Sequence, residues 1–320
     1  MELAYNELRY DPIKFVFQHG DEVTKLHLLQ FLDVLENKKG KDLILHLLKS
    51  QMSSGGFPSK FDRRSEGIRE TCRSARLLLK CGIPHDRLNI QSAVNYLLKH
   101  QRENGGWSEN PNLAIPKQVV ELSNTQSITW LTADIIELLR SIRLEKSEPC
   151  TKALNWLRKM QNQDGGWPMF KRDEFRVDPD STAQILFMMK EIYGEDDEIW
   201  IKGIKLFEKF LDTVALDVER GYNMVPTGEK RENDIYHLTH LLISSLVDSR
   251  RRIDAGYNLN DERVKKIVKA ILNSQREDGG WRPFWTQNSD PTYTVLTLKL
   301  LVWLNILKPE NLRKHVAIYI

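Results

Sequence analysis

The sequence is poor in cysteine, in long apolar runs and in net charge, and each shortage excludes a class of protein. Its three cysteines, Cys72, Cys81 and Cys150, show no C-x-x-C spacing, which argues against a disulfide framework and favours a reducing compartment. No run approaches 18 apolar residues, and the first 20 residues lack an apolar signal segment. We therefore expect a cytoplasmic protein with no transmembrane segment. A net charge of +3 is too small to indicate a nucleic-acid binder.

Common catalytic signatures are also missing. The chain contains no G-x-x-x-x-G-K-[ST] phosphate loop and no nucleophile elbow. Six of its histidines, His19, His27, His46, His85, His100 and His315, form no cluster that indicates a metal site. No segment shows the alternation of polar and apolar residues that is typical of a β-strand, so we expect an all-α protein.

What the sequence does contain is one loop that occurs four times. The copies read QMSSGGF, QRENGGW, QNQDGGW and QREDGGW, at residues 51–57, 101–107, 161–167 and 275–281. Their final aromatic residues are 50, 60 and 114 residues apart. Since 114 is twice 57, we expect a degenerate fifth copy near residues 219–222, where Arg220-Gly221-Tyr222 keeps one glycine and the aromatic. A repeat of this length is typical of proteins built from stacked structural units.

Each part of this loop, here called the GG-aromatic loop, has a structural explanation. The glutamine follows a helix, so we expect its amide to bind the last unpaired carbonyl groups of that helix. The two glycines supply the positive φ angles that end a helix and reverse the chain. The aromatic ring is then expected to pack over the neighbouring helix end. The loop therefore predicts a fold rather than a reaction.

Between the loops the chain alternates two kinds of helix. One kind is apolar nearly all round, as at residues 185–189 and 295–304. The other has a single apolar stripe, such as Trp200, Ile204, Phe207 and Leu211. Helices that are apolar all round are buried, whereas striped helices face solvent on one side. Each repeat is thus expected to supply one inner and one outer helix.

Six such pairs can be counted along the chain. The first pair is expected at residues 22–35 and 42–49, and the last at 292–307 and 309–317. Six inner and six outer helices of matched spacing close most simply into an (α/α)6 toroid. We therefore predict one all-α domain over residues 1–320.

The spacing of glutamine, glycine and aromatic resembles the QW repeat of squalene cyclases, which protein prenyltransferase β subunits share in weaker form. The resemblance covers about residues 20–307. It implies a toroid whose central cavity holds an isoprenoid chain. Two-barrel cyclases of that family are about twice this length, so the resemblance also raises a second barrel or a homodimer as a partner.

Because the chain repeats, the starts of its inner helices can be aligned with one another. The aligned segments are Arg69-Glu70-Thr71, Ser127-Ile128-Thr129, Asp180-Ser181-Thr182, His237-Leu238-Thr239 and Thr292-Tyr293-Thr294. The shared threonine is expected to be structural. Function is expected in the variable position two residues earlier, which holds Arg69, Ser127, Asp180, His237 and Thr292.

The segment Asp178-Pro179-Asp180-Ser181-Thr182-Ala183 is the strongest candidate for catalysis. Asp178 before a proline is a typical helix N-cap, and Asp290-Pro291 repeats this pattern. The segment also resembles the D-x-D-D-T-A motif of class II terpene cyclases, whose middle aspartate protonates an alkene or epoxide. The resemblance makes Asp180 the general acid beside Asp178, although Ser181 replaces the last aspartate.

A second candidate is Asp234-Ile235-Tyr236-His237-Leu238-Thr239. It resembles the D-x-Y-H-T segment of prenyltransferase β subunits, whose histidine binds zinc. That resemblance implies a metal site made of Asp178, Asp180 and His237, holding Zn or Mg. The missing cysteine ligand is a departure, because thiolate ligands favour zinc.

Three functions follow from these patterns. The first is a class II, proton-initiated cyclase that acts on an isoprenoid without a cofactor and contacts it through aromatic residues of the inner helices, namely Trp130, Phe187, Tyr236 and Tyr293. The second is a metal-dependent prenyltransferase-like subunit that uses Asp178, Asp180 and His237. The third is a non-catalytic barrel that binds a lipid or a protein.

Overall fold

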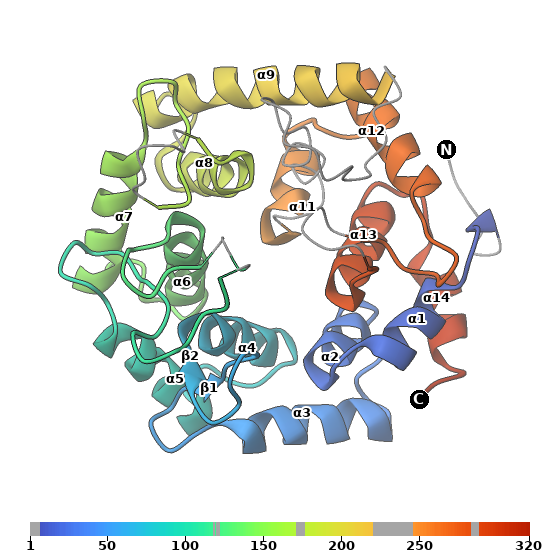
Figure 1. The fold of residues 1–320 in the computed structure, drawn as a ribbon, viewed down its shortest axis with the longest axis horizontal. Helices are drawn as coiled ribbons and strands as arrows, with labels where there is room; N and C mark the ends of the chain where they lie inside the picture. The colour runs from blue at the N-terminus through green and yellow to red at the C-terminus, as the bar shows by residue number, and fades with distance from the viewer. Residues whose placement is uncertain (1–6, 118, 120–121, 171–176, 220–245, 283–287) are drawn as a thin grey trace. The chain divides into compact units, whose positions relative to one another are not determined.

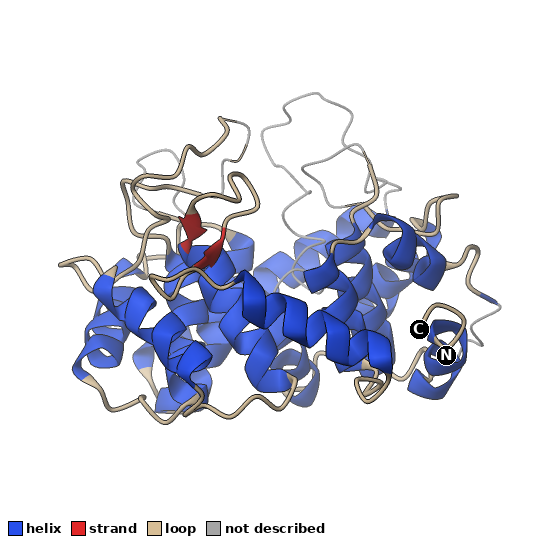
Figure 2. Ribbon diagram, turned by 90° about the horizontal axis from the view of Figure 1, so that it is seen from below, coloured by secondary structure: helices blue, strands red, loops and turns tan. Residues whose placement is uncertain are grey.

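The computed structural model describes residues 7–117, 119, 122–170, 177–219, 246–282 and 288–320. In this part of the chain the regular structure is helical except for two strands of two residues each (Figure 2). The helices are α1 (Pro12–His19), α2 (Glu22–Phe31), α3 (Lys38–Ser50), α4 (Ile68–Lys80), α5 (Leu88–Lys99), α6 (Thr129–Ser141), α7 (Glu148–Met160), α8 (Pro179–Tyr193), α9 (Glu198–Glu219), α11 (Leu246–Asp254), α12 (Glu262–Asn273), α13 (Pro291–Trp303) and α14 (Pro309–Val316). Among the described residues no helix is long and apolar enough to cross a membrane.

The chain divides into two compact units. The middle unit is Asp42–Met188, and the terminal unit combines Met1–Lys41 with Met189–Ile320. In the middle unit, α4, α6 and the first part of α8 form an inner layer, and α5 and α7 lie outside them (Figure 1). Strands β1 (Phe57–Pro58) and β2 (Glu66–Gly67) pair antiparallel immediately before α4. The expected alternation of inner and outer helices is confirmed here.

Helix α13 of the terminal unit is buried along most of its length. It packs against α1, α2 and α11, and from Tyr293 to Val302 every residue except Leu296 is buried. The outer helix α12 buries a single stripe, which consists of Val264, Ile267, Val268 and Ile271. These two patterns match the inner and outer helices that the sequence predicts.

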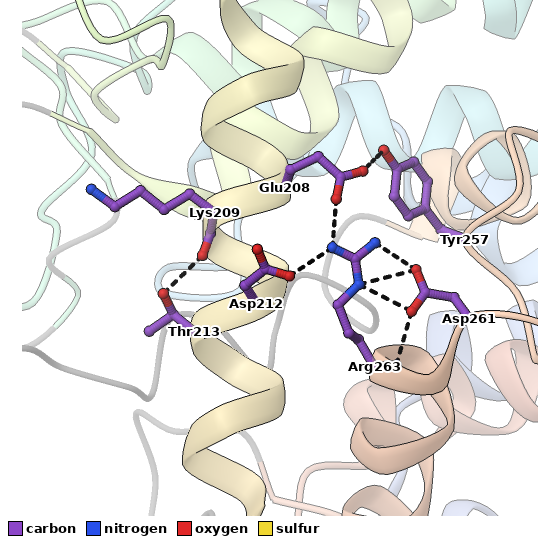
Figure 3. A network of polar contacts seen from close by, with 7 residues as sticks. All are labelled: Glu208, Lys209, Asp212, Thr213, Tyr257, Asp261 and Arg263. Carbon is purple, nitrogen blue, oxygen red and sulfur yellow. Dashed lines mark hydrogen bonds and ion pairs between the residues drawn. The ribbon is translucent and has the colours of Figure 1, made fainter.

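Polar contacts join α9 to α12 within the terminal unit (Figure 3). The Arg263 guanidinium donates to Asp212 at 2.8 Å and to Asp261 at 2.6 Å, and it also reaches Glu208. The Tyr257 hydroxyl donates to the same Glu208 carboxylate. One arginine thus links the two outer helices to the turn that precedes α12, and this network is structural.

Helix α1 is not predicted by the sequence pattern, which indicates only a polar start. Asp11 caps this helix, since its carboxylate accepts from the Lys14 N–H at 2.9 Å, and Pro12 is the first helical residue. Asp11-Pro12 is the same N-cap and proline signal that marks α8 and α13, so the sequence did contain the sign of this helix.

Each GG-aromatic loop is closed by its glutamine amide. Nε2 of Gln51, Gln101, Gln161 and Gln275 donates to the carbonyl of the first glycine, at 2.8–3.0 Å. In three loops the same Nε2 also donates to the start of another outer helix, at the carbonyls of Asn89, Pro149 and Tyr10. The glutamine therefore does not bind the end of its own helix, as the sequence analysis expects, but joins its loop to an outer helix of another repeat.

The first glycine of each loop is required for two reasons. Gly55, Gly105, Gly165 and Gly279 have φ angles of +94° to +95°, a region that other residues avoid. At Gly105, a Cβ atom would also lie 2.6 Å from the Lys152 carbonyl oxygen of α7. A side chain here would push the loop away from the helix that it contacts.

The loop aromatics join the end of one helix to the start of the next. Phe57, Trp107, Trp167 and Trp281 are at most 1% exposed. The three indole N–H groups donate to carbonyls in the last turn of the preceding outer helix, at Leu97, Leu157 and Ile271, over 2.7–2.8 Å. The indole thus satisfies the helix-end carbonyl that the sequence analysis assigns to the glutamine. The expected fifth loop, at residues 220–222, lies outside the described residues.

Removing these rings is expected to destabilise the fold strongly. Each of Trp107→Ala, Trp167→Ala and Trp281→Ala should lower the free energy of unfolding by about 3–5 kcal/mol, because a fully buried aromatic ring is lost. The measurement is urea unfolding of the purified variants. The corresponding Trp→Phe variants keep the ring and lose mainly the indole hydrogen bond, so their loss should be smaller. Three alanine variants as stable as the wild type would show that the rings do not hold the loops.

Candidate functional site

The backbone at the start of the inner helices shows which positions are equivalent. Backbone N–H groups of Ile128, Asp178 and Asp290 donate to the carbonyls of Trp107, Trp167 and Trp281 at 2.7–3.0 Å. These three residues and Gly67 are the N-caps of α6, α8, α13 and α4. Four residues later, the hydroxyls of Thr71, Thr132, Thr182 and Thr294 accept from the N–H groups of the loop aromatics at 2.9–3.0 Å. The expected structural role of the shared threonine is confirmed.

One segment of the sequence alignment is out of register. In α6 the structural threonine is Thr132, whereas Thr129 donates its hydroxyl to the Pro168 carbonyl at 2.6 Å. The variable position two residues before the threonine is therefore Trp130 and not Ser127. Among the described inner helices, that position holds Arg69, Trp130, Asp180 and Thr292.

Asp178 is the N-cap of α8. It is 5% exposed, and its Oδ2 accepts from the Ser181 N–H at 2.7 Å. Asp290 makes the same contact with the Tyr293 N–H, also at 2.7 Å. The shared geometry explains Asp178 as part of the scaffold.

Asp180 is not the cap, although an acid in the first turn is also favoured by the helix dipole. It lies in the first turn of α8, two residues after the cap, and is half-buried. Ser181, the residue that departs from the terpene cyclase motif, is fully buried, and its Oγ makes no hydrogen bond with a described residue. Ser181 thus belongs to the packing of α8, whereas Asp180 stays partly exposed, although its Oδ1 is buried.

One turn deeper, a polar network ties α8 to its neighbours. Gln184 Nε2 donates to Asp134 Oδ1 at 3.1 Å and to the Trp130 carbonyl at 3.4 Å. Arg76 of α4 forms an ion pair with the same Asp134 carboxylate. Since Gln184 is one turn after Asp180, this network fixes the orientation of the helix that carries the candidate acid.

The start of α4 is capped from a distant loop. Glu109 is fully buried, and its carboxylate accepts from the backbone N–H groups of Ile68, Arg69 and Asn110. Burial raises the pKa of Glu109, and the charge of Glu70 adds to this, while the N–H donors act in the opposite direction. This contact holds residues 108–110 against the end of α4 that carries Arg69.

The exposed positions of the inner helices in the middle unit are mostly charged. Those that are not buried include Glu70, Arg73, Arg76, Lys80, Glu137, Arg140 and Asp180. Of the aromatic residues expected to contact substrate, Trp130 is half-buried, whereas Phe187 is 1% and Tyr293 is 3% exposed. The side chains of Phe187 and Tyr293 are therefore packed in the interior of the protein. Tyr236 lies outside the described residues.

The metal alternative depends on a residue that the structure does not describe. Asp178 and Asp180 both belong to α8, but His237 lies outside the described residues. Among those residues, no group of three or more His, Cys, Asp or Glu side chains is placed to hold a metal ion. The site made of Asp178, Asp180 and His237 thus remains a prediction.

Comparison with known families gives two matches. The model of the squalene-hopene cyclase C-terminal domain matches residues 22–170. The model of the prenyltransferase alpha-alpha toroid domain matches residues 110–318, which is more than half of the chain.

Sequence matches to individual proteins cover a smaller part of the chain. A squalene–hopene cyclase from Zymomonas mobilis is 32% identical over 136 residues, which are 42% of this chain and 20% of that protein. A drimenyl diphosphate synthase from Streptomyces showdoensis is 31% identical over 142 residues, 43% of this chain and 24% of that enzyme. The matched segments thus span a quarter or less of these relatives. The structure of the type II terpene cyclase MstE from Scytonema has a TM-score of 0.52 at 15% identity, over 89% of this chain and 88% of that one, which shows a shared fold.

The capping role of Asp178 can be tested without an activity assay. Asp178→Ala should lower the free energy of unfolding by about 0.5–2 kcal/mol, whereas Asp178→Asn should change it little, because asparagine caps about as well as aspartate. Thermal or urea unfolding measures both. Asp290→Ala and Asp290→Asn are the matched pair and should behave alike. If Asp178→Asn costs as much stability as Asp178→Ala, the negative charge and not the cap is what matters.

Proposed function

Because the chain belongs to the prenyltransferase alpha-alpha toroid domain family, we propose that it is a terpene cyclase of class II, which protonates a polyprenyl substrate in the central cavity of a toroid. The observation that supports this most is the pair of aspartates in α8. Asp178 is accounted for by the backbone, while Asp180 is half-buried at the position where the chain's repeats differ. The acid role is assigned to Asp180 because residues 178–183 resemble the D-x-D-D-T-A motif of class II terpene cyclases.

In this proposal Asp180 is the general acid. Its carboxylic proton is transferred to one carbon of an alkene, which leaves a cation on the neighbouring carbon. The next double bond supplies the electron pair for the new carbon–carbon bond, and loss of a proton from the last cation ends the reaction. Solvent then returns a proton to Asp180. The acid must be protonated when the substrate binds, and the apolar chain of the bound substrate would then exclude water from the site.

In this proposal Trp130 stabilises the cation. It occupies on α6 the position that Asp180 occupies on α8, and it is half-buried. The face of an indole attracts cations through its quadrupole. Contacts of the substrate with Phe187, Tyr293 and Tyr236 stay predictions, as does pairing with a second barrel or a second copy of the chain.

The cyclase is preferred to the metal-dependent alternative for a reason of geometry. Asp178 Oδ2 already accepts a hydrogen bond from the Ser181 N–H. Capping therefore explains Asp178 at the start of α8, as it explains the equivalent aspartate at the start of α13. The cyclase mechanism needs no metal or cofactor. Bound Zn or Mg belongs to the alternative in which Asp178, Asp180 and His237 act together. The third hypothesis is a barrel that only binds a lipid or a protein.

Replacing Asp180 tests the proposal. Wild type should form cyclic products from squalene or from a farnesyl, geranylgeranyl or longer diphosphate, and Asp180→Asn should lower the rate by at least about 100-fold, as expected for loss of a general acid. Products are identified by mass spectrometry, with and without magnesium. Asp290→Asn, which removes a charge at the equivalent helix start, should stay active. Full activity of a folded Asp180→Asn variant would contradict the assignment, and no product from any substrate would favour the binding barrel.

A further inference from the structure

One turn beyond Asp180, polar side chains join three inner helices of the middle unit. They are Arg76 of α4, Asp134 of α6 and Gln184 of α8, here called the polar band. Arg76 forms an ion pair with Asp134, and Gln184 Nε2 donates to Asp134 Oδ1 at 3.1 Å. The Arg76 and Asp134 side chains are only 11% and 12% exposed. The groups of the band are therefore paired with one another more than with water.

The polar band lies on the face of the helices that carries the candidate acid. Asp134 follows Trp130 by four residues, as Gln184 follows Asp180, so each lies one turn further along the same helix face. The outer helices α5 and α7 pack against α4 and α6 from the other side (Figure 1). At 1.5 Å per residue, the two levels are about 6 Å apart. A ligand that contacts Asp180 and extends along these helices thus meets the polar band after about one turn.

Apolar surface that a ligand could cover is concentrated in the first turn of these helices. There Trp130 and Pro179 are half-buried, as Asp180 is. One turn beyond Gln184 on α8, Phe187 is buried and offers a ligand no surface. From the second turn on, the residues of α4, α6 and of α8 up to Met188 that are not buried are Leu79 and six polar or charged ones, namely Arg73, Arg76, Lys80, Glu137, Arg140 and Ser141.

A hydrocarbon chain gains affinity chiefly where it covers apolar surface. Each methylene group buried against such surface raises affinity about fourfold. Against the ion pair of Arg76 with Asp134, or that of Arg140 with Glu137 at 2.9 Å, the same chain displaces water and offers no hydrogen bond in return. Isoprene units that extend past the polar band therefore add little to binding.

We infer that the polar band limits the length of the substrate's hydrocarbon chain, so that the protein takes a prenyl chain of farnesyl length or shorter and excludes squalene and longer polyprenyl chains. The inference rests on the proposed isoprenoid substrate and names its length class. Arg76, Asp134 and Gln184 are then residues that determine specificity. They take no part in the proton transfer, which remains with Asp180.

Calorimetric titration with prenyl alcohols, which differ only in chain length, tests this without catalysis. The ligands are farnesol, geranylgeraniol and hexaprenol, which contain three, four and six isoprene units. Wild type should bind farnesol, and its affinity for the longer alcohols should be at most about twofold higher. Along an apolar wall, each added isoprene unit would instead raise affinity by at least about 10-fold.

The triple variant Arg76→Met, Asp134→Leu, Gln184→Leu replaces the polar band with apolar side chains. Exchange of a whole ion pair for apolar residues often leaves stability unchanged, and thermal unfolding verifies that the variant folds. It should bind geranylgeraniol at least about 10-fold more tightly than farnesol. Gln184→Leu alone, which keeps the ion pair, should change the preference in the same direction by a smaller factor.

The matched control is the double variant Glu148→Leu, Lys152→Met. It removes an ion pair of 2.9 Å from the outer helix α7 of the same unit, and it should keep the wild-type preference. Wild type that binds geranylgeraniol or hexaprenol 10-fold more tightly than farnesol overturns the inference. So does a folded triple variant with the wild-type preference, and so does a lack of binding of every alcohol.

Failure of this inference can be told apart from failure of the proposed reaction. If short chains bind but no substrate gives a cyclic product, the cyclase proposal fails and the length limit stands. If squalene is cyclised as fast as farnesyl diphosphate, the reaction stands and the length limit fails. Asp180→Asn should bind farnesol as wild type does, because the acid is not part of the polar band.

Discussion

The positions of the inner helices α4, α6, α8 and α13 depend on one kind of hydrogen bond, from the backbone N–H of a loop aromatic to a threonine hydroxyl. In three repeats the same tryptophan donates its indole N–H to the end of the preceding outer helix. One residue therefore joins the last turn of one helix to the first turn of another. Because Thr71, Thr132, Thr182 and Thr294 all accept this bond, each inner helix starts at the same distance from its loop. This hydrogen bond therefore also determines the geometry of the candidate site.

This regularity separates scaffold from function within a few residues. The cap and the threonine of each inner helix are occupied with backbone groups, so neither is available for chemistry. The position between the cap and the threonine varies, and it holds Arg69, Trp130 and Asp180 in the middle unit. Arg69 is neutralised by Glu70, so the indole of Trp130 and the carboxyl group of Asp180 are the two groups that the proposed reaction uses. A repeat protein can thus vary its function at one position without altering the contacts that build the fold.

The sequence predicted the helices and loops well, because their periodicity and their glycines act locally. It was less informative where two local patterns compete. Thr129 and Thr132 are both polar residues at the start of α6, and only the hydrogen bond from Trp107 shows that Thr132 is the equivalent one. The cap of α4 by Glu109 spans about 40 residues, so no local pattern reveals it. The charged face of the inner helices was missed for a similar reason: the sequence shows which residues are polar but not which ones stay uncovered.

The contact between Tyr10 and Gln275 has a consequence for folding during synthesis. The two residues exchange hydrogen bonds across 265 positions of the chain, and the backbone of Asp11 lies so close to Gly279 that a side chain there would not fit. Helix α1 is therefore a partner of a repeat that is made about 265 residues later. It must wait, with its apolar stripe uncovered, until that repeat has emerged. Contacts of such long range slow folding, and a chaperone that shields α1 during this interval would be expected to raise the yield.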